Sequence, residues 1–228
     1  MSEGIVLFPE PRESSTTGQT VILGTGGTLP VNAPEGAGAI ADSAFARLEK
    51  AGRTLGGEVM RAADASVVLE LDDAAGPSPH NADQAYAITV ADGKARVVAS
   101  APLGLFYGAI TLAQLLVREG DDIAALGCEI KDWPDLKYRG LFAESRWGQD
   151  LMTLDDWKDA IDYLADMKYN VLTIGIYNCW PIQYHGEVSE FLFVPIEKYP
   201  ELKKDQKIEY YSRKKGEGQT LKYTTKMV

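Results

Sequence analysis

Residues 137–150, KYRGLFAESRWGQD, bring two arginines, a glutamate and a tryptophan together beside a short apolar run. Arginine supplies several N–H donors, glutamate supplies a carboxylate, and tryptophan offers a flat aromatic face with one N–H donor. Side chains of these types at the end of a strand could form the floor of an active site. The same pattern also fits a buried strand with a solvated end, so both interpretations stay open.

Residues that bind metals or cofactors are few. With two cysteines and two histidines, the chain is not expected to hold a metal site with four ligands. The cysteines are widely spaced and suggest buried free thiols rather than a disulfide framework. The glycine-rich residues 25–38 lack the order G-x-G-x-x-G and a Lys-Ser/Thr ending, so they predict a loop, and no cofactor is expected. The cysteines and histidines are Cys128, Cys179, His80 and His185.

Charge and composition disfavour some classes of partner. The 228-residue chain has a formal net charge of −10, which disfavours a nucleic-acid partner because most of its surface would repel phosphates. Residues 1–11 lack the basic and apolar regions of a signal peptide. No apolar run approaches the roughly 20 residues that a membrane span needs. A soluble, cytoplasmic protein is expected, and secretion stays open if a leader has been removed.

The apolar pattern before Trp133 predicts an α+β domain. Residues 40–54 are amphipathic with helical spacing, and residues 103–117 are apolar nearly all round, which predicts a helix buried on most of its surface. An Asp-Gly turn between two alternating runs predicts a hairpin. A sheet of four or five strands with two helices on one face would account for residues 1–130. The predicted strands are residues 5–8, 20–23, 66–71, 85–90 and 95–100.

After Trp133 the pattern changes to that of a parallel β–α–β unit. Residues 138–142 and 170–176 are predicted strands, and the second lacks alternation, which indicates burial on both faces. Between them, Thr153 and Asp156 resemble a capping box at the start of an amphipathic helix. Units of this kind build parallel sheets and barrels.

The chain is too short to complete a barrel after this unit. A (β/α)₈ barrel takes about 250 residues, and far fewer follow residue 138. Residues 131–202 are therefore predicted to hold an incomplete (β/α) barrel segment. Residues 203–228 form a polar, basic tail, for which a hairpin and a disordered segment both stay open.

Two motifs make the chain resemble a known family. The segment AYAITVADGKARVVASAPLGLFYGAITLAQLL, residues 85–116, resembles the domain that precedes the catalytic barrel in glycoside hydrolase family 20, the β-N-acetylhexosaminidases. In that family an acidic residue, a further residue, Pro and then an Arg-Gly strand open the barrel, and residues 132–140 match this order. The resemblance covers roughly residues 20–180. Residues 147–148 are also similar to a stretch of family 84 hexosaminidases.

The resemblance implies a role for Arg139. The matching arginine of the family hydrogen-bonds hydroxyl groups of the sugar at the non-reducing end, which suits a guanidinium with several donors in a fixed fork. The alternative is an arginine paired with Asp132 or Asp135 at a domain junction. Both roles stay open at this point.

Five further residues are predicted to contact carbohydrate. Glu144 matches an acidic position of the family strand, where it could orient an arginine or touch sugar. Arg146 follows it by two residues, whereas the family arginine follows by three. Trp147 could stack on a sugar or belong to a core or an interface. Asn178 and Trp180 would lie at the carboxyl end of the second strand, where barrel enzymes build their sites.

No catalytic residue is predicted in this chain. In the family, a Gly-Gly-Asp-Glu type motif performs the chemistry: the glutamic acid protonates the leaving oxygen, and the aspartate steadies the acetamido group of the substrate as it attacks. That motif is absent here. The adjacent acidic pairs at residues 72–73, 121–122 and 155–156 fall in predicted turns and at a helix start, not at strand ends.

Two hypotheses about function follow. The first is that the chain is part of a glycosidase that removes terminal N-acetylhexosamine, or a related sugar, and is inactive alone. The second is a non-catalytic carbohydrate-binding or assembly module. In both, the expected partner is a carbohydrate, and the exposed edge of the barrel segment at residues 170–176 predicts a homodimer.

Overall fold

The computed structural model of this chain divides into two compact units. The first comprises Met1–Arg139 with Asp166–Lys168, and the second comprises Gly140–Ala165 with Tyr169–Val228. The residues that the structure describes are 6–72, 77–143, 153–174, 182–184, 187–189, 206–212 and 217–223.

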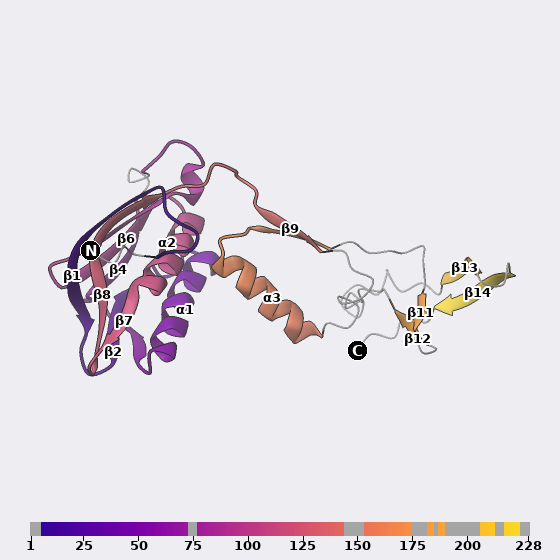
Figure 1. The fold of residues 1–228 in the computed structure, drawn as a ribbon, viewed down its shortest axis with the longest axis horizontal. Helices are drawn as coiled ribbons and strands as arrows, with labels where there is room; N and C mark the ends of the chain where they lie inside the picture. Colours follow the sequence, from indigo (N-terminus) through magenta and orange to yellow (C-terminus); the bar gives the residue numbers. More distant parts are fainter. Residues whose placement is uncertain are drawn as a thin grey trace. The chain divides into compact units, whose positions relative to one another are not determined.

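A mixed sheet of eight strands forms the first unit (Figure 1). Its strands are β1 (Glu13–Gly24), β2 (Thr28–Asn32), β3 (Glu58–Arg61), β4 (Val67–Leu71), β5 (Tyr86–Ala91), β6 (Lys94–Ala99), β7 (Leu116–Glu119) and β8 (Asp122–Asp132). Their order is β1-β8-β5-β6-β4-β2-β3, with β7 also beside β8. Neighbours from β1 to β6 are antiparallel, as are β7 and β8, whereas β6, β4, β2 and β3 run parallel.

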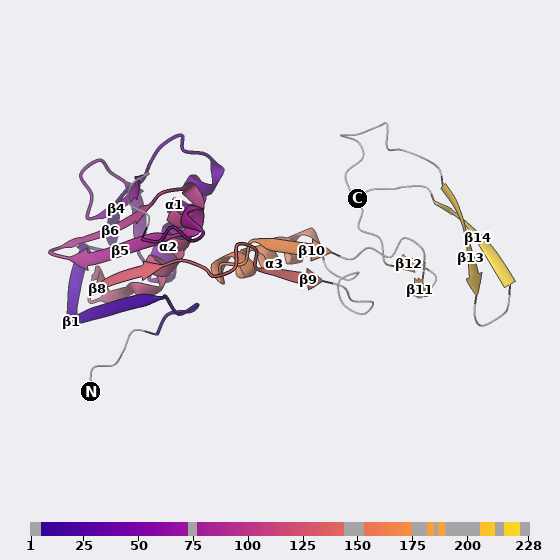
Figure 2. The same ribbon diagram turned by 90° about the horizontal axis from the view of Figure 1, so that it is seen from above.

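Two helices, α1 (Ala39–Thr54) and α2 (Pro102–Leu115), cover one face of this sheet, as Figures 1 and 2 show. α1 is amphipathic and buries Ala41, Phe45 and Leu48 at helical spacing. α2 is buried nearly all round because it packs against α1, β4, β5 and β6, and against the short 3₁₀ helix η1 (Ala82–Gln84). In the described part of the chain, no helix has the length and apolar character needed to cross a membrane.

The β5–β6 hairpin confirms the prediction from its Asp-Gly turn. Ala91 pairs with Lys94, and the two residues between them, Asp92 and Gly93, have φ angles of 51° and 73°. Positive φ at both central residues is typical of the two-residue turn whose twist matches that of the flanking strands.

Two glycines let α2 lie close to the sheet. Gly104 and Gly108 are four residues apart and therefore share one face of the helix. A Cβ atom at position 104 would collide with the carbonyl oxygen of Ala85, and one at position 108 would collide with Cγ1 of Val97. The helix backbone thus approaches the sheet more closely than larger side chains would allow.

The second unit contains a parallel β–α–β arrangement of β9 (Gly140–Ala143), α3 (Leu154–Asp166) and β10 (Val171–Ile174). The predicted capping box opens α3. The Thr153 N–H donates to Asp156 Oδ2 at 2.7 Å, and the Asp156 N–H donates to Thr153 Oγ1 at 3.2 Å. These reciprocal hydrogen bonds satisfy donors that the first turn of a helix leaves unpaired.

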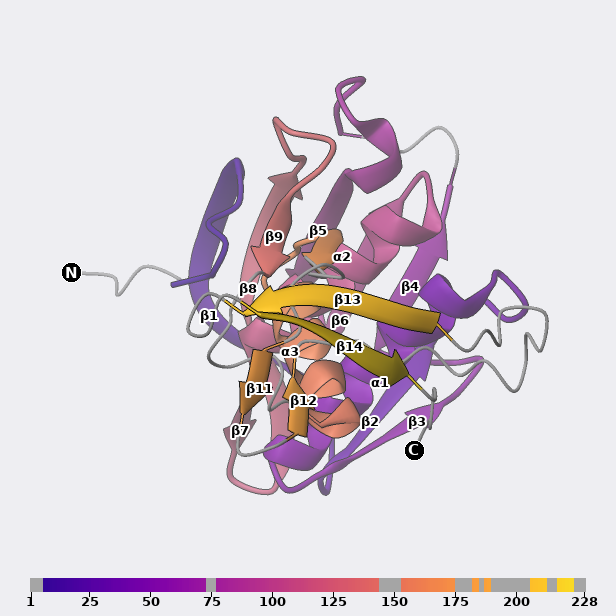
Figure 3. The same cartoon turned by 90° about the vertical axis from the view of Figure 1, so that its right-hand side faces the viewer.

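Two antiparallel pairs of short strands follow in the second unit. For the tail, residues 203–228, the hairpin is the prediction that the described strands support, and Figure 3 shows that pair in yellow. The strands are β11 (Ile182–Tyr184) with β12 (Glu187–Ser189), and β13 (Gln206–Ser212) with β14 (Glu217–Tyr223).

The α+β class of the first unit is confirmed, but its sheet is larger than the predicted four or five strands. Residues 25–38, predicted as a loop, contain β2, and β3, β7 and β8 are missing from the predicted set. β2 carries a proline and is extended because parallel neighbours on both sides hold it, a constraint that its own sequence does not contain. Residues 6–8 are not a strand, and the helix predicted to reach residue 117 ends where β7 begins.

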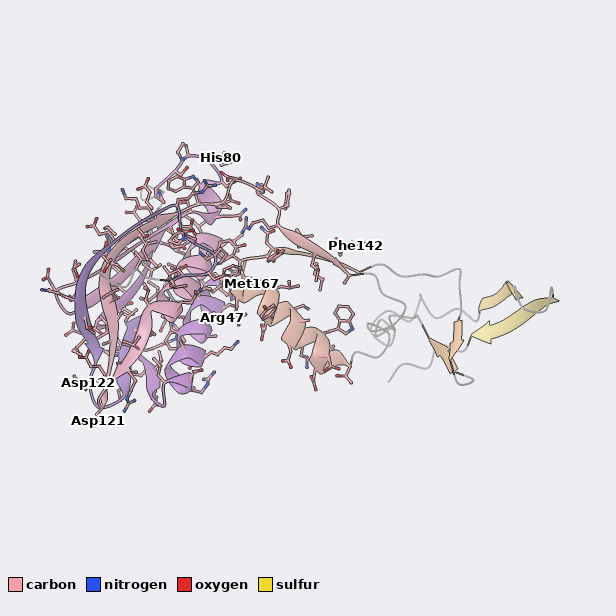
Figure 4. All side chains as sticks on the ribbon, viewed as in Figure 1. Arg47, His80, Asp121, Asp122, Phe142 and Met167 are labelled. Atoms are coloured by element: carbon pink, nitrogen blue, oxygen red, sulfur yellow. The ribbon has the colours of Figure 1, made fainter. Side chains whose placement is uncertain are left out.

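The predicted burial of residues 170–176 on both faces is wrong for the described part of that strand. Val171 in β10 is 37% exposed, and in β9 Leu141 is 46% and Phe142 is 58% exposed. Figure 4 shows Phe142 projecting from β9. Parallel strands are normally covered on both faces, so the described residues leave this pair without a complete apolar covering.

Replacing the two glycines of α2 distinguishes a backbone contact from a side-chain contact. Gly104→Ala is expected to lower the free energy of unfolding by about 1–3 kcal/mol, because the new methyl group meets a backbone oxygen. The double variant Gly108→Ala with Val97→Ala is expected to lose ~1 kcal/mol less free energy of unfolding than the sum of the two single variants. The second change removes the atom that the new methyl group would meet. Urea denaturation of the single and double variants measures both. Equal coupling of Gly104→Ala with Val97→Ala would contradict this packing.

Cys128, on β8, is a buried free thiol as predicted. It is 2% exposed, and burial raises the pKa of its thiol to about 11. Cys179 lies outside the described residues.

The raised pKa of Cys128 makes stability depend on pH in a defined direction. The neutral thiol contributes fully below the pKa of 9.0 of an ordinary cysteine, and this contribution is lost as the pH rises toward about 11. The free energy of unfolding of the wild-type chain minus that of Cys128→Ala is therefore expected to fall by about 1 kcal/mol from about pH 8 to about pH 10. Urea denaturation at both pH values measures it. A constant difference would mean that Cys128 ionises normally in the folded chain.

Candidate functional site

Arg139 lies immediately before β9 and binds backbone carbonyl groups. Its Nε and Nη2 groups donate to the carbonyl oxygen of Lys168 at 3.0 and 2.8 Å, so two N–H groups hold one acceptor. Its Nη1 group donates to the carbonyl oxygen of Leu136 at 2.7 Å and to Oε1 of Gln84 at 2.9 Å. The rigid fork of a guanidinium group suits acceptors that converge from several directions.

Gln84 and Tyr107 also contact Arg139. Gln84 is 2% exposed, and besides accepting from Arg139 it donates through Nε2 to the carbonyl oxygen of Lys137 at 2.9 Å. The guanidinium carbon lies 5.4 Å from the centre of the Tyr107 ring, within the range of a cation–π contact. The segment that leads to β9 is therefore tied to η1 and α2.

Lys168 is a buried lysine with a second set of contacts. It is 5% exposed, and its Nζ donates to Oδ2 of Asp132 at 3.0 Å and to the hydroxyl of Tyr86 at 2.6 Å. The Tyr86 hydroxyl donates to the same carboxylate oxygen at 2.8 Å and lies 2.6 Å from Oγ1 of Thr111. The side chains of Lys168, Asp132, Tyr86 and Thr111 form the lysine cluster.

Burial and the nearby carboxylate act on the lysine cluster in opposite directions. Burial lowers the pKa of Lys168, and the charge and hydrogen bond of Asp132 offset part of that shift. Burial, followed by the charge of Asp132, raises the pKa of Tyr86 well above its ordinary value, so the hydroxyl keeps its proton. A buried ammonium group needs both an opposite charge and hydrogen bonds, and this cluster supplies both.

The tripeptide Asp166–Lys168 is held at both ends. The Asp166 carboxylate pairs with Arg47 at 3.1 Å and with Lys50 at 3.0 Å, both on α1. At the other end Lys168 belongs to the lysine cluster. Between them, Met167 lines a hollow of about 420 Å³ beside α1 and α2, which Arg47 also lines; Figure 4 labels both residues.

The structure describes one of the six residues predicted to bind sugar, and that residue is Arg139. Its predicted contact with sugar hydroxyls stays a prediction. So do the roles of the others, which lie outside the described residues: Glu144, Arg146, Trp147, Asn178 and Trp180.

The two carboxylates considered as partners of Arg139 each pair with another cation. Asp132 pairs with Lys168, and Asp135 pairs with Arg12, which holds the pKa of the Asp135 carboxyl below its usual value. The described contacts of Arg139 thus fit a junction role, but through carbonyl groups and Gln84 rather than through a predicted carboxylate.

The described acidic pairs are occupied by local contacts. In the β7–β8 turn, which Figure 4 labels, Asp121 lies 3.8 Å from Arg118, and Asp122 accepts from the N–H of Gly26 at 3.0 Å. Residues 155–156 stand in the first turn of α3, where the second one caps the helix. Within the described residues, no group of three or more Cys, His, Asp or Glu could hold a metal ion.

Sequence reasoning did not identify the lysine cluster. The alternation of β5 does place Tyr86 on its inward side, and a buried tyrosine needs a partner for its hydroxyl, so a signal was available. Lys168 offers no comparable signal of burial, because a lysine just after an amphipathic helix is usually solvated. Its partners Tyr86 and Asp132 lie 82 and 36 residues away in the chain.

The comparison with family models finds one match. Residues 5–133 match the model described as glycosyl hydrolase family 20, domain 2. None of the curated proteins matches the chain in sequence.

Solved structures of similar fold are larger than this chain. An exo-β-N-acetylglucosaminidase from Vibrio harveyi, in complex with N-acetylglucosamine, has a TM-score of 0.62 at 20% identity, over 76% of this chain and 26% of that one. An N-acetyl-β-hexosaminidase from Streptomyces plicatus has a TM-score of 0.59 at 22% identity, over 75% of this chain and 34% of that one. A glycoside hydrolase family 20 β-N-acetylglucosaminidase has a TM-score of 0.54 at 26% identity, over 78% of this chain and 32% of that one. This chain spans between a quarter and about a third of their length.

Arg139→Lys keeps the positive charge but removes the guanidinium fork. The free energy of unfolding is expected to fall by ~1–3 kcal/mol, because one ammonium group cannot reach the same carbonyls and Gln84 together. The matched control is Arg96→Lys, whose pair with Glu70 is on the surface, and a change within about 0.5 kcal/mol is expected. Urea denaturation measures both. Equal losses in the two variants would contradict the anchoring role of Arg139.

Proposed function

Because the chain belongs to glycosyl hydrolase family 20, we propose that it is part of a glycosidase that removes terminal N-acetylhexosamine, or a related sugar, from glycans. The observation that carries the proposal is the match of residues 5–133 to domain 2 of that family. The similar solved structures are β-N-acetylglucosaminidases and hexosaminidases, one of them bound to N-acetylglucosamine, and they support this class of sugar.

We further propose that β9, α3 and β10 are the first β–α–β unit of a (β/α)₈ barrel. Their parallel pairing with a helix between the strands supports this assignment. The exposed apolar side chains of β9 and β10 support it as well, since the strands of a closed barrel are covered on both faces.

The predicted sugar contacts fit this barrel at the carboxyl ends of its strands. Glu144, Arg146 and Trp147 follow β9 in the sequence, and Asn178 and Trp180 follow β10. Barrel enzymes build their sites at these ends. In such a site the carboxylate and the guanidinium would bind sugar hydroxyls, while the tryptophans would stack on apolar sugar faces.

Arg139 stands at the opposite end of β9. It precedes the strand and binds carbonyl groups of the first unit. These contacts are not the pairing with Asp132 or Asp135 that the sequence left open, and a contact of Arg139 with sugar hydroxyls remains a prediction.

The chemistry proposed for the whole enzyme is substrate-assisted hydrolysis. The acetamido group of the sugar attacks the anomeric carbon, an aspartate steadies that group, and a glutamic acid protonates the leaving oxygen. The acidic pair needed for these steps is not recognisable in the sequence of this chain. We therefore propose that these 228 residues do not catalyse the reaction alone.

An assay with 4-nitrophenyl N-acetyl-β-glucosaminide tests the proposal. No release of nitrophenol is expected from the 228-residue chain, because an Asp-Glu pair of the family's type is not recognisable in its sequence. The coding sequence after Val228 is expected to continue in frame and to contain an Asp-Glu pair, and the longer product is expected to hydrolyse the substrate. Changing that glutamate to glutamine should lower kcat by ~10²–10⁴. Turnover by the 228-residue chain, or an inactive longer product that contains the pair, would contradict the proposal.

A further inference from the structure

We propose that Lys168 and Arg139 are positioning residues, which together fix the points at which the parallel strands β9 and β10 begin. The chain leaves the first unit twice, after Arg139 and after Lys168. β9 begins directly after the first of these points and β10 begins shortly after the second, with Gly140 opposite Val171. Whatever holds the two points together therefore sets the register in which the strands meet.

A direct contact joins the two points. The Nε and Nη2 groups of Arg139 both donate to the carbonyl oxygen of Lys168. Two N–H groups that converge on one oxygen restrict where that oxygen lies relative to the guanidinium plane. The direction of the Lys168 carbonyl then depends on the backbone conformation of this residue.

That backbone conformation is unusual for a lysine. Lys168 has a φ angle of 59°, and the Tyr169 N–H donates to the carbonyl oxygen of Leu164 at 2.9 Å. This is the Schellman arrangement at a helix C-terminus, in which the left-handed residue is usually glycine. A lysine there gives up backbone freedom, so a compensating contact of its side chain is expected.

The lysine cluster supplies the compensating contact. The Lys168 ammonium group reaches Asp132 and Tyr86, and those two residues face each other across β8 and β5. In proteins, apolar residues of similar volume often replace a buried ion pair without loss of stability, because the pair must offset the loss of water around both charges. We therefore explain the lysine cluster by the one backbone position of Lys168 that it selects, and not by a net gain in the free energy of unfolding.

The neighbouring contacts of the tripeptide add to this arrangement. Asp166, two residues before Lys168, is paired with Arg47 and Lys50 on α1. These pairs hold Asp166 itself and make no contact with the Lys168 carbonyl. The lysine cluster is therefore the contact whose loss should affect β9 and β10 selectively.

Hydrogen exchange of the 228-residue chain tests the proposal. In Lys168→Met, the amides of β9 and β10 are expected to exchange at least ~10-fold faster than in the wild-type chain, and those of the edge strand β3, which carries no residue of the lysine cluster, less than ~3-fold faster. The matched control is Lys131→Met. Lys131 precedes Asp132 in the chain, but it is exposed and its Nζ lies 4.0 Å from the carboxylate of Glu13. It should change neither set. Unchanged exchange of β9 and β10 in Lys168→Met would overturn the proposal.

Lys168→Gly separates the backbone conformation from the side chain. Glycine adopts the left-handed conformation freely, so the hydrogen bond between Tyr169 and Leu164 should persist. Exchange in β9 and β10 is nevertheless expected to be as fast as in Lys168→Met, because the ammonium anchor is gone. Exchange as slow as in the wild-type chain would overturn the proposal.

A double variant without buried charge distinguishes positioning from overall stability. Lys168→Met with Asp132→Asn leaves no unpaired ion, so its Tm is expected to recover relative to Lys168→Met. Exchange of the β9 and β10 amides is expected to stay fast. Recovery of both the Tm and the slow exchange would mean that the cluster acts only through stability, and the assignment would fail. No step of this test depends on the proposed glycosidase activity.

Discussion

The ammonium group of Lys168 is shielded from water, and a carboxylate and a hydroxyl take the place of its hydration. Both groups come from the sheet, where Tyr86 and Asp132 are opposite residues of β5 and β8. Strands β5 and β8 therefore form a polar binding position for Lys168, which lies far from both in the sequence. With its ammonium group bound there, Lys168 accepts two hydrogen bonds from Arg139 through its carbonyl oxygen. These two hydrogen bonds also hold the segment that precedes β9. Within the first unit, the two points at which the chain enters and leaves it are thus joined by a polar network.

The fold was predictable where local chemistry and final structure agree. The Asp-Gly turn, the amphipathic stripe of α1 and the capping box at Thr153 all act within a few residues, and each is present in the structure. Strands β2 and β3 were not predicted because short segments with glycine or proline nearby carry little intrinsic preference for a strand. They are extended because they pair with parallel neighbouring strands, and these pairings between separate segments cannot be seen in the local sequence pattern.

The candidate site was predictable only in part, for a related reason. Arg139 could be singled out because it opens a strand within a recognisable motif. What it binds could not, since Gln84 and Lys168 come from distant parts of the chain. The burial of Lys168 was equally hidden, because lysine is among the residues that are least often buried.

A helix that is apolar on every side has no preferred face, and α2 could in principle roll on the sheet beneath it. Gly104 and Gly108 remove that freedom, because only their side of the helix is flat enough for this close approach. A rotation by one residue, about 100°, would turn Leu105 and Ala109 onto the strands and lift the helix away. The orientation of α2 is therefore selected by the missing side chains at Gly104 and Gly108, together with the hydrogen bond between Thr111 and Tyr86.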